Sequence, residues 1–222
     1  MGIKNEESAM TTEHSHYAAR LEIDHPEKLD KFSSFFRLLF GIPIAFLLGA
    51  LTYSEYVIHD SSKTGFDVQS ASSTAVALAS ATALMIIFRG RYPRWWFDFS
   101  LELARFQTRV FSYFALLSDR YPSADEEQSV HLDLDYPDVE RDLHRFLPLV
   151  KWILAIPHYI VLCLLGVLAL LSVILAWFAI LFTGRYPKGL FDFVVGWARW
   201  SLRVQAYAFL LVTDRYPPFS MR

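Results

Sequence analysis

Two long apolar runs dominate the pattern of hydrophobic and polar positions along the chain. The first covers residues 36–88 and is interrupted by a polar stretch between His59 and Asp67. The second covers residues 150–183 and has no charged residue after Lys151. A helix needs about 17 to 25 apolar residues to cross a bilayer. The pattern therefore predicts membrane segments at about 36–58, 71–88 and 150–183.

Each apolar run is followed by a segment in which polar residues recur every three or four positions. This spacing predicts amphipathic helices at about 95–117 and 190–212, with a narrow charged stripe and a broad aromatic face. The charged members of the stripes are Asp98, Glu102, Arg105 and Arg109 in the first segment, and Asp192, Arg199 and Arg203 in the second. Helices of this kind lie in the membrane interface.

The two halves of the chain repeat one unit. GRYPRWWFDF begins at Gly90, GRYPKGLFDF begins 94 residues later at Gly184, and Asp-Arg-Tyr-Pro follows both amphipathic segments. Upstream, the residues from Leu21 to Pro26 resemble those from Leu132 to Pro137, and the residues from Phe36 to Pro43 resemble those from Val150 to Pro157. An internal repeat of this length predicts two copies of one structural unit.

The path of the second apolar run has two readings. The first half carries roughly 20 extra residues around 53–73, and an insertion is cheap at the tip of a hairpin but not inside a single spanning helix. Repeat equivalence therefore favours a hairpin in both halves. In 150–183 its arms are ~24 Å long, short of the ~30 Å hydrocarbon core, so this hairpin would be re-entrant. The rival reading, with nearly equal support, is one long tilted helix, which avoids a turn in hydrocarbon.

The positive charges favour the hairpin slightly. Arg145 and Lys151 flank one end of 150–183, while Arg185 and Lys188 flank the other. Because positive charge accumulates on the cytoplasmic side, both ends are expected there. We therefore predict a bacterial inner-membrane protein whose N-terminus and C-terminus are cytoplasmic.

These elements predict an all-α integral membrane protein with two repeated units, each a transmembrane or re-entrant hairpin followed by an interfacial helix. The expected divisions are a disordered polar tail at 1–20, the first repeat at 21–122, an acidic linker at 123–148 and the second repeat at 149–222.

The composition supports a membrane environment and limits the classes of molecule that are expected as partners. Hydrophobic residues make up 54% of the 222 positions and aromatic residues 16%, which is too apolar for an ordinary soluble domain. The net charge of −2 and the lack of a basic stripe exclude nucleic acid as an expected partner. The single cysteine, Cys163, excludes an internal disulfide and a cysteine-based metal site. Membrane lipids and other membrane subunits remain as expected partners, and the oligomeric state is open.

The second half resembles a known family. The resemblance rests on the residues Ala155–His158, Ala176–Pro187, Gly189–Phe193, Arg199–Trp200, Arg203–Tyr207 and Asp214–Phe219. These match the bacterial DUF4389 family, membrane proteins without an assigned function. The first half matches more loosely, and its polar insertion departs from the family's compact apolar segment. The resemblance implies a membrane protein with two tandem copies of the unit, and it implies no reaction.

The charged stripes are the first candidate site. Asp98 and Arg105, like Asp192 and Arg199, lie seven residues apart and therefore on one helix face. A solvated face is the ordinary explanation, with the arginines contacting lipid phosphates at about 1 kcal/mol each. The sharper alternative is pairing of the stripes with each other or with a partner subunit, because unpaired charge is costly in a membrane.

The remaining candidates are the chain breaks and one histidine. The breaks, Arg91-Tyr92-Pro93 and Arg185-Tyr186-Pro187, combine an aromatic membrane-edge anchor with a helix start. His158 near the start of an apolar run could bind a haem or chlorophyll-type metal. Its counterpart in the first half is Ile44, so we expect an ordinary hydrogen-bonded histidine and no cofactor.

The sequence contains no recognisable catalytic motif, and we expect no enzyme activity. The leading expectation is an accessory or scaffold subunit of a larger inner-membrane complex. The alternative is membrane shaping by wedge-like hairpins and amphipathic helices. A small transporter is a weaker third reading, because the halves read as parallel rather than inverted repeats.

Overall fold

The computed structural model describes residues 17–26, 28–57, 69–123 and 129–222. Its elements, in chain order, are β1 (Ala19–Ile23), α2 (Lys31–Thr52), β2 (Tyr53–Val57), β3 (Gln69–Ser73), α3 (Thr74–Leu84), the π-helical turn η1 (Met85–Arg89), α4 (Arg94–Phe114), β4 (Val130–Leu134), α5 (Val139–Asp142), α6 (Pro148–Leu154), α7 (Ile156–Thr183) and α8 (Lys188–Ala208). The chain is mostly helical, as expected, but the expectation of an all-α fold is wrong because two antiparallel strand pairs are present.

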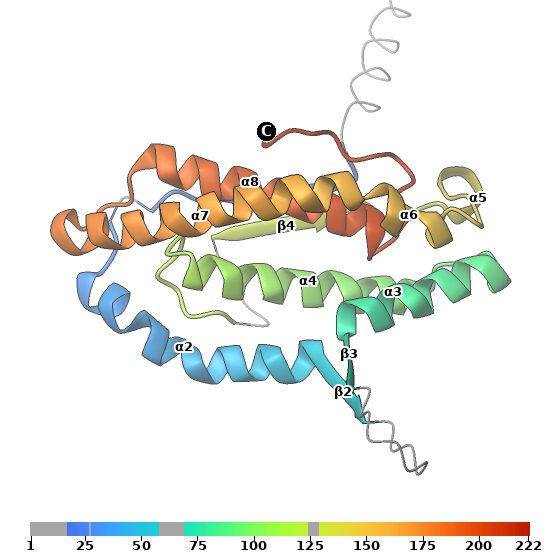
Figure 1. The fold of residues 1–222 in the computed structure, drawn as a ribbon, viewed down its shortest axis with the longest axis horizontal. Helices are drawn as coiled ribbons and strands as arrows, with labels where there is room; N and C mark the ends of the chain where they lie inside the picture. The colour runs from blue at the N-terminus through green and yellow to red at the C-terminus, as the bar shows by residue number, and fades with distance from the viewer. Residues whose placement is uncertain (1–16, 27, 58–68, 124–128) are drawn as a thin grey trace, which may run out of the picture.

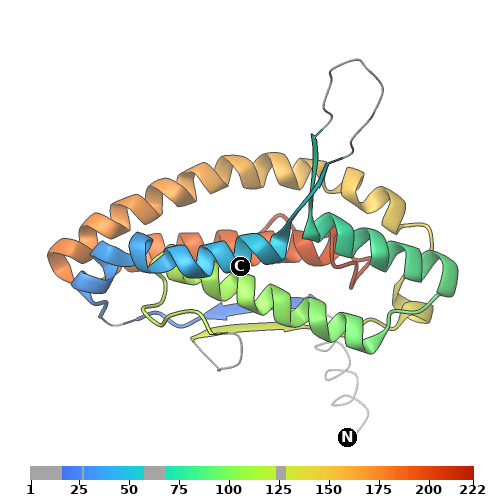
Figure 2. The ribbon, with the colours of Figure 1, turned by 90° about the horizontal axis from the view of Figure 1, so that it is seen from below.

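The elements form layers in a flattened molecule (Figures 1 and 2). Helix α7 lies on one broad face, α8 lies between α7 and strand β1, and the pair β1–β4 lies on the opposite face. Helix α4 contacts both β4 and α2. The two amphipathic helices α4 and α8 thus occupy the middle of the molecule, where they separate the apolar helices from the sheet.

The second apolar run does not form a hairpin. Residues 156–183 are one continuous helix, α7, which follows the short helix α6 after a break at Ala155. Figure 2 shows α7 as an arch whose middle lies farthest from the sheet. Gly166, near the middle of α7, leaves room for the ring of Trp197: a Cβ there would meet the ring at 3.4 Å. This glycine serves helix packing and not a turn, so the expected hairpin in 150–183 is wrong.

The first apolar run is divided into two helices. Helices α2 and α3 are separated by strands β2 and β3, which pair antiparallel from Tyr53 with Ser73 to Val57 with Gln69. The expected polar insertion begins inside this strand pair, and residues 58–68 lie outside the described part of the chain. The strand pair projects from the same side of the molecule as the crest of α7 (Figure 2).

The segment expected to be an acidic linker contains a structural element. Strand β4 lies within 123–148 and pairs with β1, with Leu21 opposite Leu132 at the centre of the pair. Both strands bury alternate residues, as a sheet with one covered face requires. Leu21 and Leu132 are also equivalent positions of the sequence repeat, so the two copies meet about a pseudo-two-fold axis at this leucine pair.

Each copy supplies the strand that covers the amphipathic helix of the other copy. Strand β1 of the first repeat packs on α8 of the second, and β4 of the second packs on α4 of the first. The buried residues of both strands belong to one hydrophobic core together with residues of α4, α7 and α8. The two halves of the chain are therefore interlocked rather than arranged as separate units.

Candidate functional site

The arginines of the α4 stripe face the sheet. Arg105 donates from Nε to the carbonyl oxygen of Leu132 at 2.9 Å. Its two terminal nitrogens contact the carboxylates of Glu102 at 2.7 Å and Asp133 at 3.0 Å. Arg109 donates to the carbonyl of Ser123 at 2.9 Å. Asp98, in contrast, is exposed, and Arg94 lies 3.9 Å from its carboxylate.

The arginines of the α8 stripe occupy equivalent places. Arg199 donates from Nε to the carbonyl of Leu21 at 3.0 Å, which repeats the bond between Arg105 and Leu132. Arg199 also reaches the carbonyl of Met221, while Arg203 donates to the backbone oxygens of Ser220 and Arg222. Asp192 is exposed. The stripes thus bind the strand of the other repeat and the C-terminal segment through their arginines and leave their first acids at the surface.

At the two Arg-Tyr-Pro segments the chain changes direction between an apolar helix and the amphipathic helix that follows it. Gly90 and Gly184 end the preceding helices with φ angles of 57° and 71°, a left-handed conformation that favours glycine. Pro93 and Pro187 then cap α4 and α8 in an extended conformation. The break residues Arg91 and Arg185 are exposed.

The tyrosines of the two breaks are buried, so they do not act as surface anchors. The hydroxyl of Tyr92 donates to the carbonyl of Leu210 at 3.0 Å, and burial raises the pKa of this phenol to about 12. Tyr186 is only 2% exposed, and burial raises the pKa of its phenol as well. Both side chains pack in the core next to a phenylalanine of the following helix, Phe97 or Phe191.

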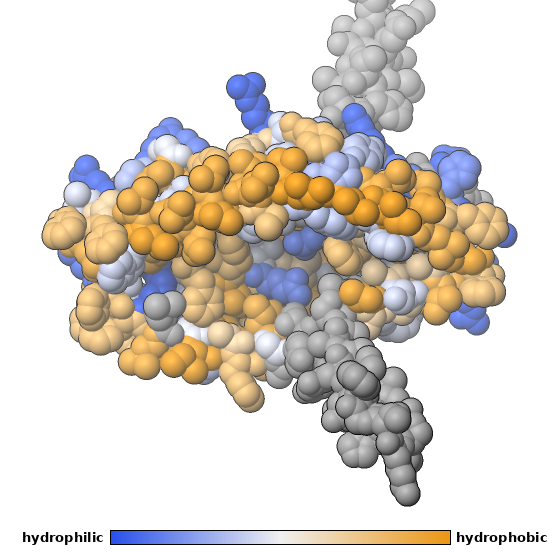
Figure 3. Space-filling model, viewed as in Figure 1, coloured by the Kyte–Doolittle hydropathy of each residue, from blue (hydrophilic) through white to orange (hydrophobic). Residues whose placement is uncertain are grey.

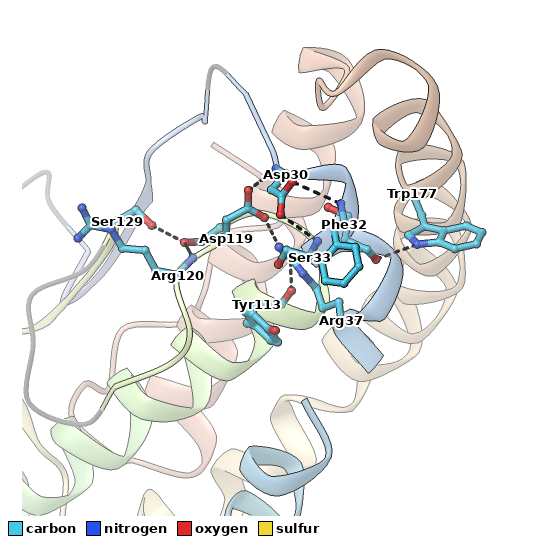
Figure 4. Close-up of polar contacts among 11 residues, drawn as sticks. Asp30, Phe32, Ser33, Arg37, Tyr113, Asp119, Arg120, Ser129 and Trp177 are labelled. Carbon is cyan, nitrogen blue, oxygen red and sulfur yellow. Dashed lines mark hydrogen bonds and ion pairs between the residues drawn. The ribbon is translucent and has the colours of Figure 1, made fainter. Parts of the chain in front are cut away.

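Two buried ion pairs connect α2 and α6, where the two apolar runs begin, to the Asp-Arg-Tyr-Pro motif of the same half of the chain. Arg37 pairs with Asp119 and donates to the carbonyl of Tyr113 at 2.9 Å (Figure 4). Lys151 pairs with Asp214 at 2.6 Å and donates to the carbonyl of Thr213 at 2.8 Å. Both cations are almost fully buried.

These ion pairs share further details that follow the repeat. Each cation lies over the ring of an equivalent tyrosine, Tyr113 at 4.7 Å or Tyr207 at 5.2 Å from the ring centroid. Burial lowers the pKa of Lys151, and the hydrogen bond that its ammonium group donates to Asp214 opposes that shift. From the sequence, Lys151 is interpreted only as a charge that flanks an apolar run. The signal in the sequence that points to these ion pairs is the recurrence of one basic residue and one aspartate at equivalent positions of both halves.

His158 is enclosed by aromatic rings. Its ring stacks on Phe219 with centroids 4.0 Å apart and contacts Tyr216, and its Nδ1 accepts a hydrogen bond from the indole of Trp200 at 3.2 Å. An Nδ1 that accepts leaves the proton of a neutral imidazole on Nε2, where a metal would otherwise bind. The residues present therefore do not fit a metal ligand at His158, and the described part of the chain holds no cluster of metal-ligating side chains.

An extensive apolar surface is exposed on the face of α7. This helix is long and apolar enough to cross a membrane, and only 17% of its most apolar window is buried inside the molecule. Figure 3 shows apolar residues running along α7 and α2 on this face. Helix α2 reaches the length of a span only if its two parts, bent by 49°, are counted together. Soluble monomers rarely expose contiguous apolar patches beyond a few hundred Å².

The comparisons with known proteins reach the second half of the chain only. Residues 148–221 match the family model described as a domain of unknown function, DUF4389. This match agrees with the resemblance read from the sequence, and it covers one copy of the repeat. No curated protein and no solved structure matches the chain.

Proposed function

We propose that the chain is a non-catalytic membrane protein that inserts its apolar face into one leaflet as a wedge and thereby shapes the membrane. The observation that carries this proposal is the exposed arch of α7, most of whose apolar side chains are not covered by the described part of the molecule. An apolar surface of this extent is stable in lipid and unstable in water. Material inserted into one leaflet only expands that leaflet and favours curvature.

The placement of charged and polar groups supports insertion without crossing. The exposed Arg145 lies just before α6, and the exposed Arg185 and Lys188 lie just after α7. The sheet, whose exposed positions include Glu22 and Asp133, lies on the face opposite the crest of the arch (Figure 2). In this orientation both ends of α7 stay near the headgroups of the cytoplasmic leaflet of a bacterial inner membrane.

A cysteine-labelling experiment tests the orientation. In a Cys163→Ser background, single cysteines replace Asp138 before α6 and Gly189 at the start of α8. A membrane-impermeant thiol reagent applied from the cytoplasmic side of inverted vesicles is expected to label both. Labelling of the two positions from opposite sides means that α7 crosses the bilayer, and the one-leaflet wedge is then wrong.

A vesicle experiment tests the shaping activity. Purified chain reconstituted into liposomes is expected to produce tubules or constricted vesicles visible by electron microscopy. The matched control is Leu168→Asn/Leu171→Asn, which places polar groups on the exposed side of α7 and leaves the buried Ala169 untouched. Unchanged spherical vesicles at high protein density would contradict membrane shaping.

Helix α2 supports a second candidate function, an accessory subunit of a membrane complex. Four phenylalanines on this helix are exposed: Phe32, Phe35, Phe40 and Phe46. Their exposed fractions range from 45% at Phe40 to 79% at Phe46. Aromatic side chains are enriched at the centres of protein interfaces. Purification from native membranes in mild detergent is expected to recover a partner in fixed stoichiometry, and Phe40→Ala/Phe46→Ala is expected to release it. A lone chain carrying only lipid contradicts this candidate.

A further inference from the structure

An open cleft lined by arginines lies between strand β1, helix α8 and the C-terminal segment. Its volume is about 520 Å³. The charged residues that line it are Arg20, Glu22, Arg199, Arg203, Arg215 and Arg222. Five arginines thus line the cleft with one acidic side chain, Glu22, while Arg20 pairs with Asp135 and Arg222 also carries the terminal carboxyl group. The cleft keeps an excess of positive charge.

The two central arginines of the cleft contact mainly backbone oxygens. Arg199 donates to the carbonyls of Leu21 and Met221, and Arg203 donates to the carbonyl of Ser220 and to a carboxyl oxygen of the terminal residue Arg222. Among the described residues, no aspartate or glutamate carboxylate lies within ion-pair distance of either guanidinium. The Nε of Arg203 is buried without a hydrogen-bond partner in the described structure. Burial, and next the nearby charge of Arg199, lower the pKa of Arg203.

The equivalent place in the first repeat is neutralised. There Arg105, the counterpart of Arg199, contacts the carboxylates of both Glu102 and Asp133. In the second repeat Gly196 replaces Glu102, and the C-terminal segment packs where a side chain would stand: a Cβ on Gly196 would lie 2.9 Å from the Cβ of Met221. The fold thus tolerates both arrangements: two carboxylate side chains contact Arg105, whereas no aspartate or glutamate side chain of the described residues pairs with Arg199.

The cleft also lies apart from the apolar face. Arg199 points from α8 toward β1, and β1 lies on the opposite side of α8 from α7. A ligand in the cleft therefore approaches from the polar side of the molecule. The inference below does not depend on whether the arch of α7 bends a membrane.

We propose that this cleft is a binding site for a phosphate-bearing anion, held between the guanidinium groups of Arg199 and Arg203. Planar guanidinium groups bind phosphate oxygens through paired charge-assisted hydrogen bonds. The cleft is larger than one inorganic phosphate, so it fits a diphosphate or a phosphate ester. Such a group is supplied either by a soluble phosphate or by the headgroup of an anionic lipid.

Isothermal titration calorimetry in detergent with inorganic pyrophosphate tests the soluble source. Wild-type protein is expected to bind, with affinity that falls as salt rises, and Arg203→Gln is expected to weaken binding at least tenfold. The matched control is Arg109→Gln, which removes the equivalent arginine of the first repeat. Equal binding by wild type and Arg203→Gln would overturn the assignment of the site.

Chemical protection tests the lipid source and needs no variant. Arginines are modified with phenylglyoxal and mapped by mass spectrometry, with Arg120 and Arg141 as exposed references. Selective protection of Arg199 and Arg203 by phosphatidylglycerol vesicles, but not by phosphatidylcholine vesicles, assigns the site to a lipid headgroup. Protection by pyrophosphate alone assigns it to a soluble phosphate. If neither probe protects these two arginines, the cleft is no phosphate site and the proposal is wrong.

Discussion

At the scale of single residues, the loss of a buried ion pair is expected to have the largest electrostatic effect on stability. Lys151 is fully buried, while its partner Asp214 keeps 16% of its side chain exposed. A buried charge that loses its partner keeps its desolvation cost without the compensating attraction. The aspartates of the two Asp-Arg-Tyr-Pro motifs are therefore structural residues, and their removal is expected to affect stability before it affects any surface property.

Asp214→Asn is expected to lower the free energy of unfolding by about 3 kcal/mol, because it leaves Lys151 charged and unpaired. The double substitution Lys151→Met/Asp214→Asn is expected to recover most of this loss. The control is Asp135→Asn, which breaks an exposed pair with Arg20 and should cost less than about 1 kcal/mol. Denaturant unfolding followed by tryptophan fluorescence measures all three, and an equal cost for Asp214→Asn and Asp135→Asn contradicts the prediction.

Tyr92 makes stability depend on pH in the alkaline range. In the unfolded chain a tyrosine loses its proton near pH 10, whereas burial raises the pKa of the folded Tyr92 phenol to about 12. The folded state then holds more protons than the unfolded state, so stability falls as pH rises from 10 toward 12. Between pH 9 and pH 11 the loss due to Tyr92 is roughly 1.3 kcal/mol. Tyr92→Phe is expected to remove this part of the slope, and equal slopes in both proteins would contradict it.

At the scale of elements, the left-handed glycine before each Arg-Tyr-Pro break sets where the apolar helix stops. Gly184 ends α7 with a φ of 71°, and its amide donates to the carbonyl of Ile180. Gly184→Ala forces an alanine into this conformation and is expected to cost about 1 kcal/mol. Gly189→Ala is the control, because Gly189 lies inside α8 and a Cβ there meets nothing within 4 Å. That change is expected to be neutral or to stabilise by up to about 1 kcal/mol. Thermal unfolding of both variants measures whether each substitution lowers or raises the stability of the protein.

The elements also divide by how far they could be predicted from sequence. Helices α4 and α8 coincide closely with the amphipathic segments, because a period of three and four residues is a local signal. The continuous course of α7 agrees with the rival reading of one long helix and not with the slightly favoured hairpin, which rests on applying the insertion near Tyr53 to both halves. The insertion bears only on the first half, where β2 and β3 hold it. A repeat in sequence does not require equal connections between equivalent helices.

The sequence did not predict strands β1 and β4 or the groups that the stripe arginines bind, and the reason is a different one. Strands β1 and β4 have only five residues each, and their pairing joins Leu21 to Leu132 over a long sequence separation. Because β4 contains a histidine and an aspartate, its sequence resembles the polar linker around it. Without that strand, nothing in the sequence indicated a carbonyl for Arg105 to bind. The charged stripes were recognised, but their main contacts depend on tertiary structure.

At the scale of the whole molecule, the exchange of strands makes the two repeats depend on each other. Strand β1 covers α8, and Arg199 bonds to Leu21 of that strand, while Arg105 bonds to Leu132 across the pseudo-two-fold axis. The segment 148–221 that matches the family model contains neither strand. A second repeat without β1 exposes the buried face of α8, including Val195 and Leu202.

Residues 126–222 expressed alone are therefore expected to aggregate or to remain sensitive to protease, although they contain the whole segment 148–221. Coexpression with residues 1–125 as a separate chain is expected to restore a folded complex, because both strands and both covered helices are then present. Copurification through a tag on one fragment measures the association. Leu21→Asp on the first fragment is the control, since it places a charge on the buried face of β1 beside α8. If the second fragment alone is monodisperse and protease-resistant, the repeats are independent units, and the interlocked arrangement has no part in the stability of the protein.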